Sequence, residues 1–594
     1  MMNRLALAVI IALSVTVHRA SSQSADANAR AVRVSDQAKT PDTASPRRAI
    51  TGLVLDENGE PVADAQIIID RVGIRNQMQF INTDAAGRFK TPGLAPGLYA
   101  MEVHSPGFII QPGATGPGFR RPGEHLIFNM VKGGVITGRV TDLTGDPVVS
   151  VNVTAHRVRD TVGRKVMRDT ETWSTDDRGI YRLYGLNPGR YVVSVSEASE
   201  VYAGGSGTGD VSPTYYPATM RDAAVEITVQ AGEEISGIDI EHRGEHGHAI
   251  SGIVSRDLGT DYAAGDISVK MVRASSGEID KVATLSPASR FAFYGVPDGE
   301  YDVFAQKLYS QQGNATSAKR RVVLRGADVV GVDLKLVKYG AIAGRVVMPK
   351  AGQLAPRCES PTRFQLEETL VDARSDSQTK RWEDQFFVPD EYWGSWRGSV
   401  LDQNGGFTIR NLVSGLYRLN VDLPGEDWYV RALIQPTAGL PRRNPEDSRS
   451  GIAIKSGESV TGVEVHIAEG AASLRGQVVY VNDSSTKDAA RQARQSQIHL
   501  LPVEDALAGD LLQYAETLTD RNGSFEFKNR APGRYWLVAR PAPEVESAEA
   551  QSRPVAWDAG QRMKLRQEAK VSKNEIEVKP CQRAADFQLK VNLR

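Results

Sequence analysis

The chain has 594 residues, of which 41% are hydrophobic and 24% charged, a mix typical of a folded soluble protein. Its 71 Lys and Arg residues nearly balance 72 Asp and Glu residues, giving a formal net charge of −1 at pH 7. A protein that neutralises a phosphate backbone usually carries a basic excess or a basic stripe, so we expect no nucleic acid partner. At roughly 150 residues per domain, the length indicates about four domains.

Residues 1–22 have the three parts of an export signal. Arg4 supplies a positive charge, Leu5 to Val17 form an apolar stretch of thirteen residues, and the small residue Ala20 begins a cleavage region. Thirteen residues are too few to span a bilayer, and no later apolar run reaches the roughly 18 residues that a span requires. The sequence therefore predicts a signal peptide over 1–22, no membrane span, and a periplasmic, extracellular or cell-surface location. Residues 23–46 lack apolar periodicity and are predicted to be a flexible leader.

Cys358 and Cys581 are the only cysteines. In an oxidising compartment they can form one disulfide, whereas two cysteines alone cannot build a structural zinc site. We predict one disulfide between them. A disulfide scaffold is excluded, so hydrophobic cores must hold the fold together.

From Ile50 onward, one pattern recurs five times: an apolar residue, a spacer, Gly, a spacer and Val. Apolar residues on both sides of a Gly indicate a half-buried strand that another backbone approaches closely. The central glycines are Gly52, Gly138, Gly252, Gly344 and Gly476.

The second half of each unit gives the strongest signal. In every unit, an aromatic residue is followed ten residues later by a Tyr. In four of the five units, the aromatic residue ends an Asp-x-x-Gly-x-aromatic turn motif. Asp caps such a turn with its carboxylate and Gly supplies a positive φ; in the third unit, Ser286 and Ser289 replace them. The aromatic pairs are Phe89 and Tyr99, Tyr181 and Tyr191, Phe291 and Tyr301, Phe407 and Tyr417, and Phe525 and Tyr535.

The five tyrosines are predicted to be structural residues at the corner of each unit. A Gly stands two places before each Tyr and follows Pro in three units, for example Pro96-Gly97, which predicts a type II turn. After the Tyr, apolar residues recur with period two, as in Tyr191, Val193 and Val195, which indicates a strand with one buried face.

Many short strands with regular turn signals and almost no helical periodicity predict an all-β protein, a tandem array of about five prealbumin/Ig-like β-sandwich domains. Steps of 92 to 118 residues between the corner tyrosines suit one small sandwich each. The predicted domains are residues 47–133, 134–245, 246–339, 340–470 with an aromatic-rich insertion, and 471–594.

These motifs resemble those of the carboxypeptidase regulatory-like domain, a transthyretin-like β-sandwich related to starch-binding and collagen-adhesin B-type modules. The resemblance covers nearly all of residues 47–594 and is clearest in the first, second and fifth units. It implies a secreted, multi-domain, non-catalytic protein of the kind found at bacterial surfaces. It also places the chain in the carbohydrate-binding-like superfamily.

Complete catalytic signatures are missing from the sequence. Two His-x-x-Glu triplets, His242 to Glu245 and His466 to Glu469, match part of a zinc peptidase motif. Residues three apart on a strand point to opposite faces, so neither pair is expected to converge on one metal ion. There is no Gly-x-Ser-x-Gly elbow and no P-loop. We expect no catalytic residues, no metal site and no cofactor.

One segment of the fourth unit concentrates aromatic residues, because three of the seven Trp residues fall within fifteen residues. Exposed indole rings stack on sugar rings, and nearby carboxylates accept hydrogen bonds from hydroxyl groups. The alternative is that the insertion buries its aromatic residues against the sandwich. The candidate ligand-binding residues are Trp382, Asp390, Tyr392, Trp393 and Trp396.

The sequence favours a secreted, non-enzymatic binding or structural protein. Two alternatives remain: an array of carbohydrate-binding modules centred on the fourth domain, and an accessory subunit of a peptidase system. The expected partners are a polysaccharide or a cell-surface protein.

Overall fold

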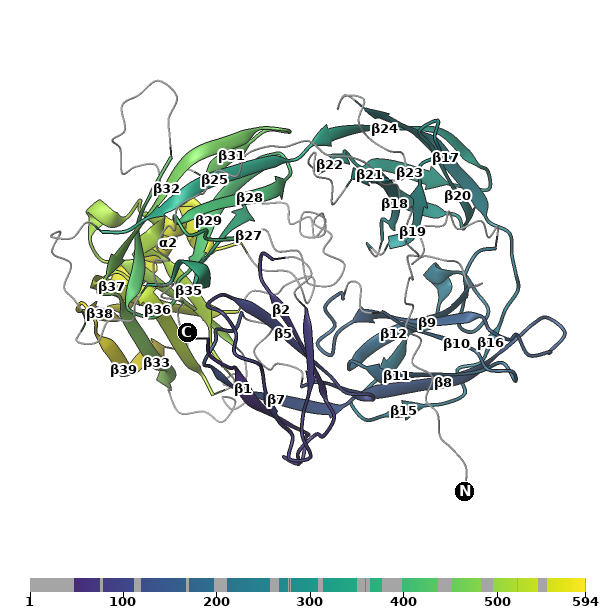
Figure 1. Ribbon diagram of the computed structural model, residues 1–594, viewed down its shortest axis with the longest axis horizontal. Coiled ribbons are helices and arrows are strands. Elements are labelled where there is room, and N and C mark those ends of the chain that lie inside the picture. The colour runs from purple at the N-terminus through teal and green to yellow at the C-terminus, as the bar shows by residue number, and fades with distance from the viewer. Residues whose placement is uncertain are drawn as a thin grey trace, which may run out of the picture. The chain divides into compact units, whose positions relative to one another are not determined.

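The computed structural model shows an all-β tandem array (Figure 1). The sandwiches belong to one compact unit, Pro46–Arg594. The structure describes residues 47–74, 78–111, 119–166, 170–196, 211–256, 266–275, 277, 279–307, 314–349, 358, 364–376, 398–435, 451–481, 495–520, 522–542 and 553–592. The predicted signal peptide and flexible leader lie outside these residues.

The first sandwich packs a four-stranded sheet, ordered β4-β1-β7-β6, on a three-stranded sheet, ordered β3-β2-β5. Ile50, Val54 and Phe89 meet Ile67 and Tyr99 in the core between them. The strands are β1 (Thr51–Leu55), β2 (Gln66–Arg71), β3 (Gln79–Asn82), β4 (Arg88–Lys90), β5 (Tyr99–His104), β6 (Phe108–Ile110) and β7 (His125–Lys132).

The second sandwich has one sheet built on β9, β10, β12, β13 and β14, and a second built on β8, β11, β15 and β16. Tyr191, Val193 and Val195 lie on one face of β12 and join the core, as the period-two pattern predicts. Val192 and Ser194 on the other face are buried as well, so the strand does not have a single buried face. The elements are β8 (Gly134–Thr141), β9 (Asn152–Arg159), β10 (Thr170–Ser174), β11 (Ile180–Leu186), β12 (Gly189–Ser196), β13 (Thr214–Tyr215), η1 (Arg221–Ala223), β14 (Ile227–Val229), β15 (Glu234–Ile235) and β16 (Ile240–Glu241).

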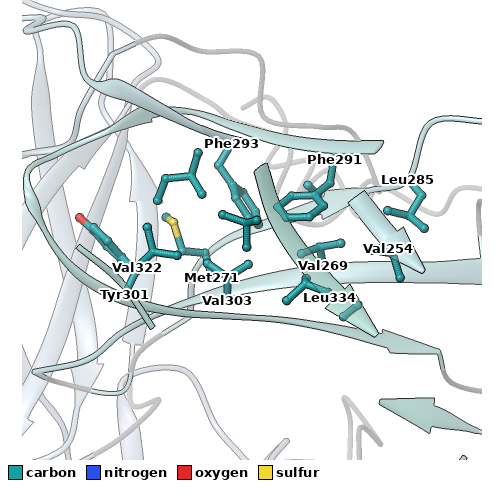
Figure 2. Close-up of a cluster of buried hydrophobic side chains, with 14 of the residues drawn as sticks. Val254, Val269, Met271, Leu285, Phe291, Phe293, Tyr301, Val303, Val322 and Leu334 are labelled. Carbon is teal, nitrogen blue, oxygen red and sulfur yellow. The ribbon is translucent and has the colours of Figure 1, made fainter. Parts of the chain in front are cut away.

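The third unit does not have two separate sheets like the other units. Its strands form one eight-stranded sheet among the described residues. Strand β22 pairs with both β21 and β24, so the short segment joins the two layers at one edge. Figure 2 shows the core between the layers, which includes Met271, Phe291, Phe293 and Tyr301. The strands are β17 (His248–Arg256), β18 (Ile267–Arg273), β19 (Ile279–Thr284), β20 (Arg290–Val296), β21 (Gly299–Lys307), β22 (Ala315–Ser317), β23 (Arg320–Leu324) and β24 (Val329–Lys338).

The fourth sandwich packs the sheet β28-β25-β32-β30 on the sheet β27-β26-β29-β31. Tyr417, Phe407 and Trp428 are among its buried side chains. The elements are β25 (Gly340–Val347), η3 (Leu366–Glu368), β26 (Leu370–Ser375), β27 (Gly398–Val400), β28 (Gly406–Leu412), β29 (Gly415–Asp422), β30 (Trp428–Ile434), β31 (Ile452–Ile454) and β32 (Ser459–Glu469).

The fifth sandwich packs the sheet β36-β33-β39 on the sheet β35-β34-β37-β38 and adds the helix α2 (Ala559–Ser572), which the sequence analysis did not predict. Asp558 caps the helix by accepting a hydrogen bond from the Gln561 amide, and Lys573 ends it with a positive φ of 53°. The other elements are β33 (Ala472–Val481), β34 (Ser496–Pro502), η6 (Asp505–Leu507), η7 (Leu511–Gln513), β35 (Ala515–Leu518), β36 (Ser524–Arg530), β37 (Gly533–Pro541), η8 (Val555–Trp557), β38 (Glu575–Val578) and β39 (Arg583–Asn592).

The opening strand of every unit has the same two neighbours. It pairs antiparallel with the strand that carries the first motif aromatic and parallel with a strand from the end of the unit. In the fourth unit, Gly344 stands opposite Phe407, and a Cβ atom on Gly344 would lie 2.1 Å from the Val463 carbonyl oxygen. The glycine therefore allows the parallel strand and the aromatic ring to approach the backbone.

The predicted Asp turns are present in four units. Asp402 accepts hydrogen bonds from the amides of Asn404 and Gly406, and Asp84, Asp176 and Asp520 make equivalent pairs. In the third unit, the Ser286 hydroxyl accepts from the Arg290 amide, so serine keeps the turn.

The predicted type II turn before the corner tyrosines is wrong. Gly97 has a φ of 157°, far from the value near +80° that this turn requires. Glycine suits this position because residues with a side chain rarely adopt such a φ, whereas the nearest atom to a Cβ on Gly97 belongs to the flexible end of Arg71.

A β-bulge four residues after the first motif aromatic recurs in units two to five. The bulge residues have positive φ values of 74°, 59°, 61° and 56°, and they are Gly185, Gly295, Asn411 and Asn529. Glycine and asparagine suit this conformation best.

Each bulge also lies against the preceding unit. A Cβ atom on Gly133 would lie 2.6 Å from Gly185, and the Gly295 carbonyl accepts a hydrogen bond from Ser212. Asn411 accepts from Asn314 at 2.9 Å.

Candidate functional site: a cavity between the fourth and fifth sandwiches

The predicted aromatic site lies outside the described residues. This holds for Trp382, Asp390, Tyr392, Trp393 and Trp396, so carbohydrate binding through them stays a prediction.

The five corner tyrosines lie in equivalent environments. Each side chain is at most 3% exposed, and each hydroxyl donates a hydrogen bond to the carbonyl oxygen four residues earlier, at 2.6–3.0 Å. Burial raises the pKa of Tyr535 to about 12. The accepting residues are Ala95, Asn187, Pro297, Val413 and Ala531.

The two cysteines are joined in the structure. Cys358 of the fourth unit and Cys581 of the fifth have Cα atoms 5.4 Å apart, within the usual range for a disulfide. The bond links segments 223 residues apart in the sequence.

Several ion pairs also cross between the fourth and fifth sandwiches. Arg553 contacts the buried Asp376 at 2.5 Å, and Arg583 contacts Asp427 at 2.6 Å. The side-chain amide of Asn529, at the bulge of the fifth unit, donates to the Trp428 carbonyl at 2.8 Å. The Arg553–Asp376 pair therefore joins the two sandwiches through a buried carboxylate.

A cavity of about 450 Å³ opens between these two sandwiches. The fourth sandwich lines it from β26, β29 and β30, and the fifth from β34, η7, β35, β36, η8 and α2. Its charged lining residues are Asp372, Arg374, Arg418, Glu516 and Arg530. Cavities of this size with a few convergent polar groups are typical of small-molecule sites.

Two arginines of the fourth sandwich meet one indole ring of the fifth. The guanidinium carbons of Arg374 and Arg418 lie 5.3 and 5.4 Å from the centroid of the Trp557 ring. Such cation–π contacts stabilise arginine where it is partly desolvated. Arg418 also contacts Asp376 at 2.7 Å.

The carboxyl groups of the cavity are partly desolvated. Burial raises the pKa of Asp372 to about 6, although Asn420 donates a hydrogen bond to it at 3.1 Å. Burial also raises the pKa of Glu516, and it lowers the pKa of the Arg374 guanidinium. Desolvation disfavours every charged form, which explains the opposite directions for acids and bases.

His499 is 2% exposed at the fifth-sandwich wall of the cavity. Burial lowers its pKa to about 4, with a smaller contribution from the positive charge of Arg540. Its Nδ1 atom lies 3.6 Å from Glu516 Oε2, and its Nε2 atom has no hydrogen-bond partner among the described residues. The imidazole is therefore neutral at pH 7.

A smaller cavity of about 100 Å³ continues the first. The two cavities share six lining residues, of which four are leucines that provide an apolar wall. The shared residues are Arg418, Leu419, Leu433, Leu511, Leu512 and Trp557.

The two His-x-x-Glu triplets have other contacts. His242 Nδ1 lies 3.2 Å from the Thr214 hydroxyl, and His466 Nε2 lies 3.0 Å from Glu464 Oε2. Within the described part of the chain, no group of three or more His, Cys, Asp and Glu residues could hold a metal ion.

The sequence analysis did not identify the cavity, because its lining comes from two units that no local sequence spacing connects. In the sequence, a Gly or Asn stands four residues after the motif aromatic in all five units, and it forms a bulge with positive φ in units two to five.

Comparison with protein families gives one match. Residues 49–112 and 135–204 match the carboxypeptidase regulatory-like domain, which is a non-catalytic type of domain. The matched segments lie in the first and second units, two of the three units in which the motifs are clearest. A search of curated proteins found no significant match.

Solved structures give distant similarities. The Bacillus anthracis TIE protein is 14% identical with a TM-score of 0.14; the alignment covers 49% of this chain and 51%, about half, of that protein. GBS52, the minor pilin of Streptococcus agalactiae, is 14% identical with a TM-score of 0.18, over 33% of this chain and 96% of the pilin. BcpA, the major pilin subunit of Bacillus cereus, is 10% identical with a TM-score of 0.14, and the alignment covers 49% of this chain and 99% of the pilin subunit. Similarities this low transfer no property to this chain.

Proposed function

We propose that this chain is an exported, non-catalytic protein whose tandem sandwiches form a structural and binding framework in the periplasm or at the cell surface. The observation that carries the proposal is the use of the repeated residues in folding contacts. The corner tyrosines bond to their own loops, and the central glycines admit a neighbouring strand. The residues of these recurring motifs therefore serve to build the fold.

The disulfide between Cys358 and Cys581 supports export, because disulfides persist mainly in oxidising compartments. Of the helices in the described ranges, none is long and apolar enough to cross a membrane.

An activity assay tests the non-catalytic part of the proposal. Purified protein should release no residues from peptides and hydrolyse no ester or glycoside. Release of C-terminal residues from a peptide, abolished by a chelator, would contradict the proposal. A pull-down from the exported fraction that recovers a peptidase would instead identify an accessory subunit.

Carbohydrate binding in the fourth domain is a second candidate function. The observation that favours it is the concentration of three Trp residues within fifteen positions, at Trp382, Trp393 and Trp396. Polysaccharide is then the expected partner.

A further inference from the structure

The cavity between the fourth and fifth sandwiches has one charged region and one apolar region. Arg374, Arg418 and Trp557 come together in the charged region. Four shared leucines form the apolar region, which extends into the smaller cavity: Leu419, Leu433, Leu511 and Leu512.

The charged region has an excess of positive charge. Arg418 and Arg553 share a single carboxylate, that of Asp376, so this group of three carries one net positive charge. Arg374 and Arg530 also line the cavity and add two positive charges.

Two carboxyl groups offset part of this excess. Asp372 and Glu516 line the same cavity, but burial raises the pKa of both groups and so weakens their anionic form. Guanidinium groups stay charged in proteins because their pKa is so high. Over the described residues of the cavity and the Asp376 group, the formal charges of four arginines and three carboxylates sum to +1.

We propose that this cavity binds an amphipathic organic anion, with the anionic group at Arg374 and Arg418 and the apolar body against Leu433, Leu511 and Leu512. An arginine fork pairs well with a carboxylate or a similar oxyanion. The leucine wall would contribute by removing the apolar body from water. This inference does not depend on the proposed structural role.

The walls of the cavity are held together before any ligand binds. The disulfide and the Arg553–Asp376 and Arg583–Asp427 ion pairs all connect the two sandwiches. A preformed site avoids part of the ordering cost of binding.

Two matched fluorescent probes test the proposal on the full chain. 1-Anilinonaphthalene-8-sulfonate is an amphipathic anion, and N-phenyl-1-naphthylamine has a closely similar apolar body without the charge. We expect one saturable sulfonate site per chain and at least tenfold weaker binding of the neutral probe. Absence of a saturable sulfonate site, or equal affinity for both probes, would overturn the proposal.

Substitutions then locate the site. Arg374→Met should weaken binding of the sulfonate at least tenfold and change binding of the neutral probe less than twofold. The matched control Arg410→Met removes an exposed arginine of the same sandwich and should change neither affinity. Unchanged sulfonate binding by folded Arg374→Met would overturn the proposal.

A second variant covers the case in which Arg374→Met does not fold. Leu512→Trp leaves every charge in place and fills the apolar region. It should lose most binding of both probes while circular dichroism stays native. Undiminished binding by this variant would place the probes elsewhere and overturn the assignment.

Discussion

The hydroxyl group of Tyr417 donates a hydrogen bond of 3.0 Å to the carbonyl oxygen of Val413, four residues earlier. The ring is fully buried in the core of the fourth sandwich, so this bond satisfies a hydroxyl that would otherwise be costly to bury. The same bond occurs in the other four units. The corner tyrosine thus combines core packing with closure of its own loop.

Tyr417→Ala should destabilise the fourth sandwich by about 3–5 kcal/mol, because it removes a large buried aromatic ring. Tyr417→Phe should cost only about 1 kcal/mol, the usual net value of one hydrogen bond. Limited proteolysis of Tyr417→Ala should cut within residues 340–470 and leave a 47–245 fragment intact. The exposed Tyr294 provides the control Tyr294→Ala, and unchanged protease resistance of Tyr417→Ala would contradict the account.

Gly344→Ala should destabilise the same sandwich by about 1–3 kcal/mol or more, because its Cβ atom would overlap the Val463 carbonyl oxygen. Gly415→Ala is the matched control, since the nearest atom to its Cβ lies 3.7 Å away. Urea unfolding of the two variants should separate them clearly. Equal stability would show that the parallel strand moves away without cost.

Acid should destabilise the fifth sandwich through His499. The unfolded chain has a histidine pKa near 6.5, whereas the folded pKa is about 4, so the unfolded state binds more protons as the pH falls from 6.5 to 4. This histidine therefore contributes stability above pH 6.5, and roughly 3 kcal/mol is lost on acidification to below pH 4.

Urea unfolding of wild type and His499→Gln between pH 7 and 4 isolates this contribution. Asp372 and Glu516 act in the opposite direction, because their raised pKa values make the folded state bind protons more readily. Wild type and His499→Gln both keep these two carboxyl groups. The difference between their slopes of unfolding free energy against pH therefore reports the contribution of His499. His246→Gln, at an exposed position, is the control. Identical pH profiles for wild type and His499→Gln would refute the prediction.

The carbohydrate hypothesis predicts weak, Trp-dependent retardation in affinity electrophoresis through soluble polysaccharides. The Trp393→Ala, Trp396→Ala double variant should migrate faster than wild type in the retarding glycan, because flat indole faces stack on sugar rings. Trp536 of β37 is buried and therefore unsuitable as a control, so the exposed Trp173→Ala serves instead. Equal mobility of all proteins in every glycan would contradict carbohydrate binding, and only the structural role would remain.

The fold was largely predictable because each unit repeats the residues that define its turns, close backbone approaches and corners. The helix α2 was missed because only Leu565, Arg566 and Ala569 of its fourteen residues are buried, which leaves little amphipathic pattern. The cavity was not predictable for another reason. Arg374 and Trp557 belong to different units, and no local spacing indicates that they meet.

Mass spectrometry of unreduced, protease-digested protein from the exported fraction tests the central claim of an exported framework most directly. The account predicts protein recovered outside the cytoplasm, with one pair of peptides joined through Cys358 and Cys581. Recovery in the cytoplasm with two free thiols would contradict it.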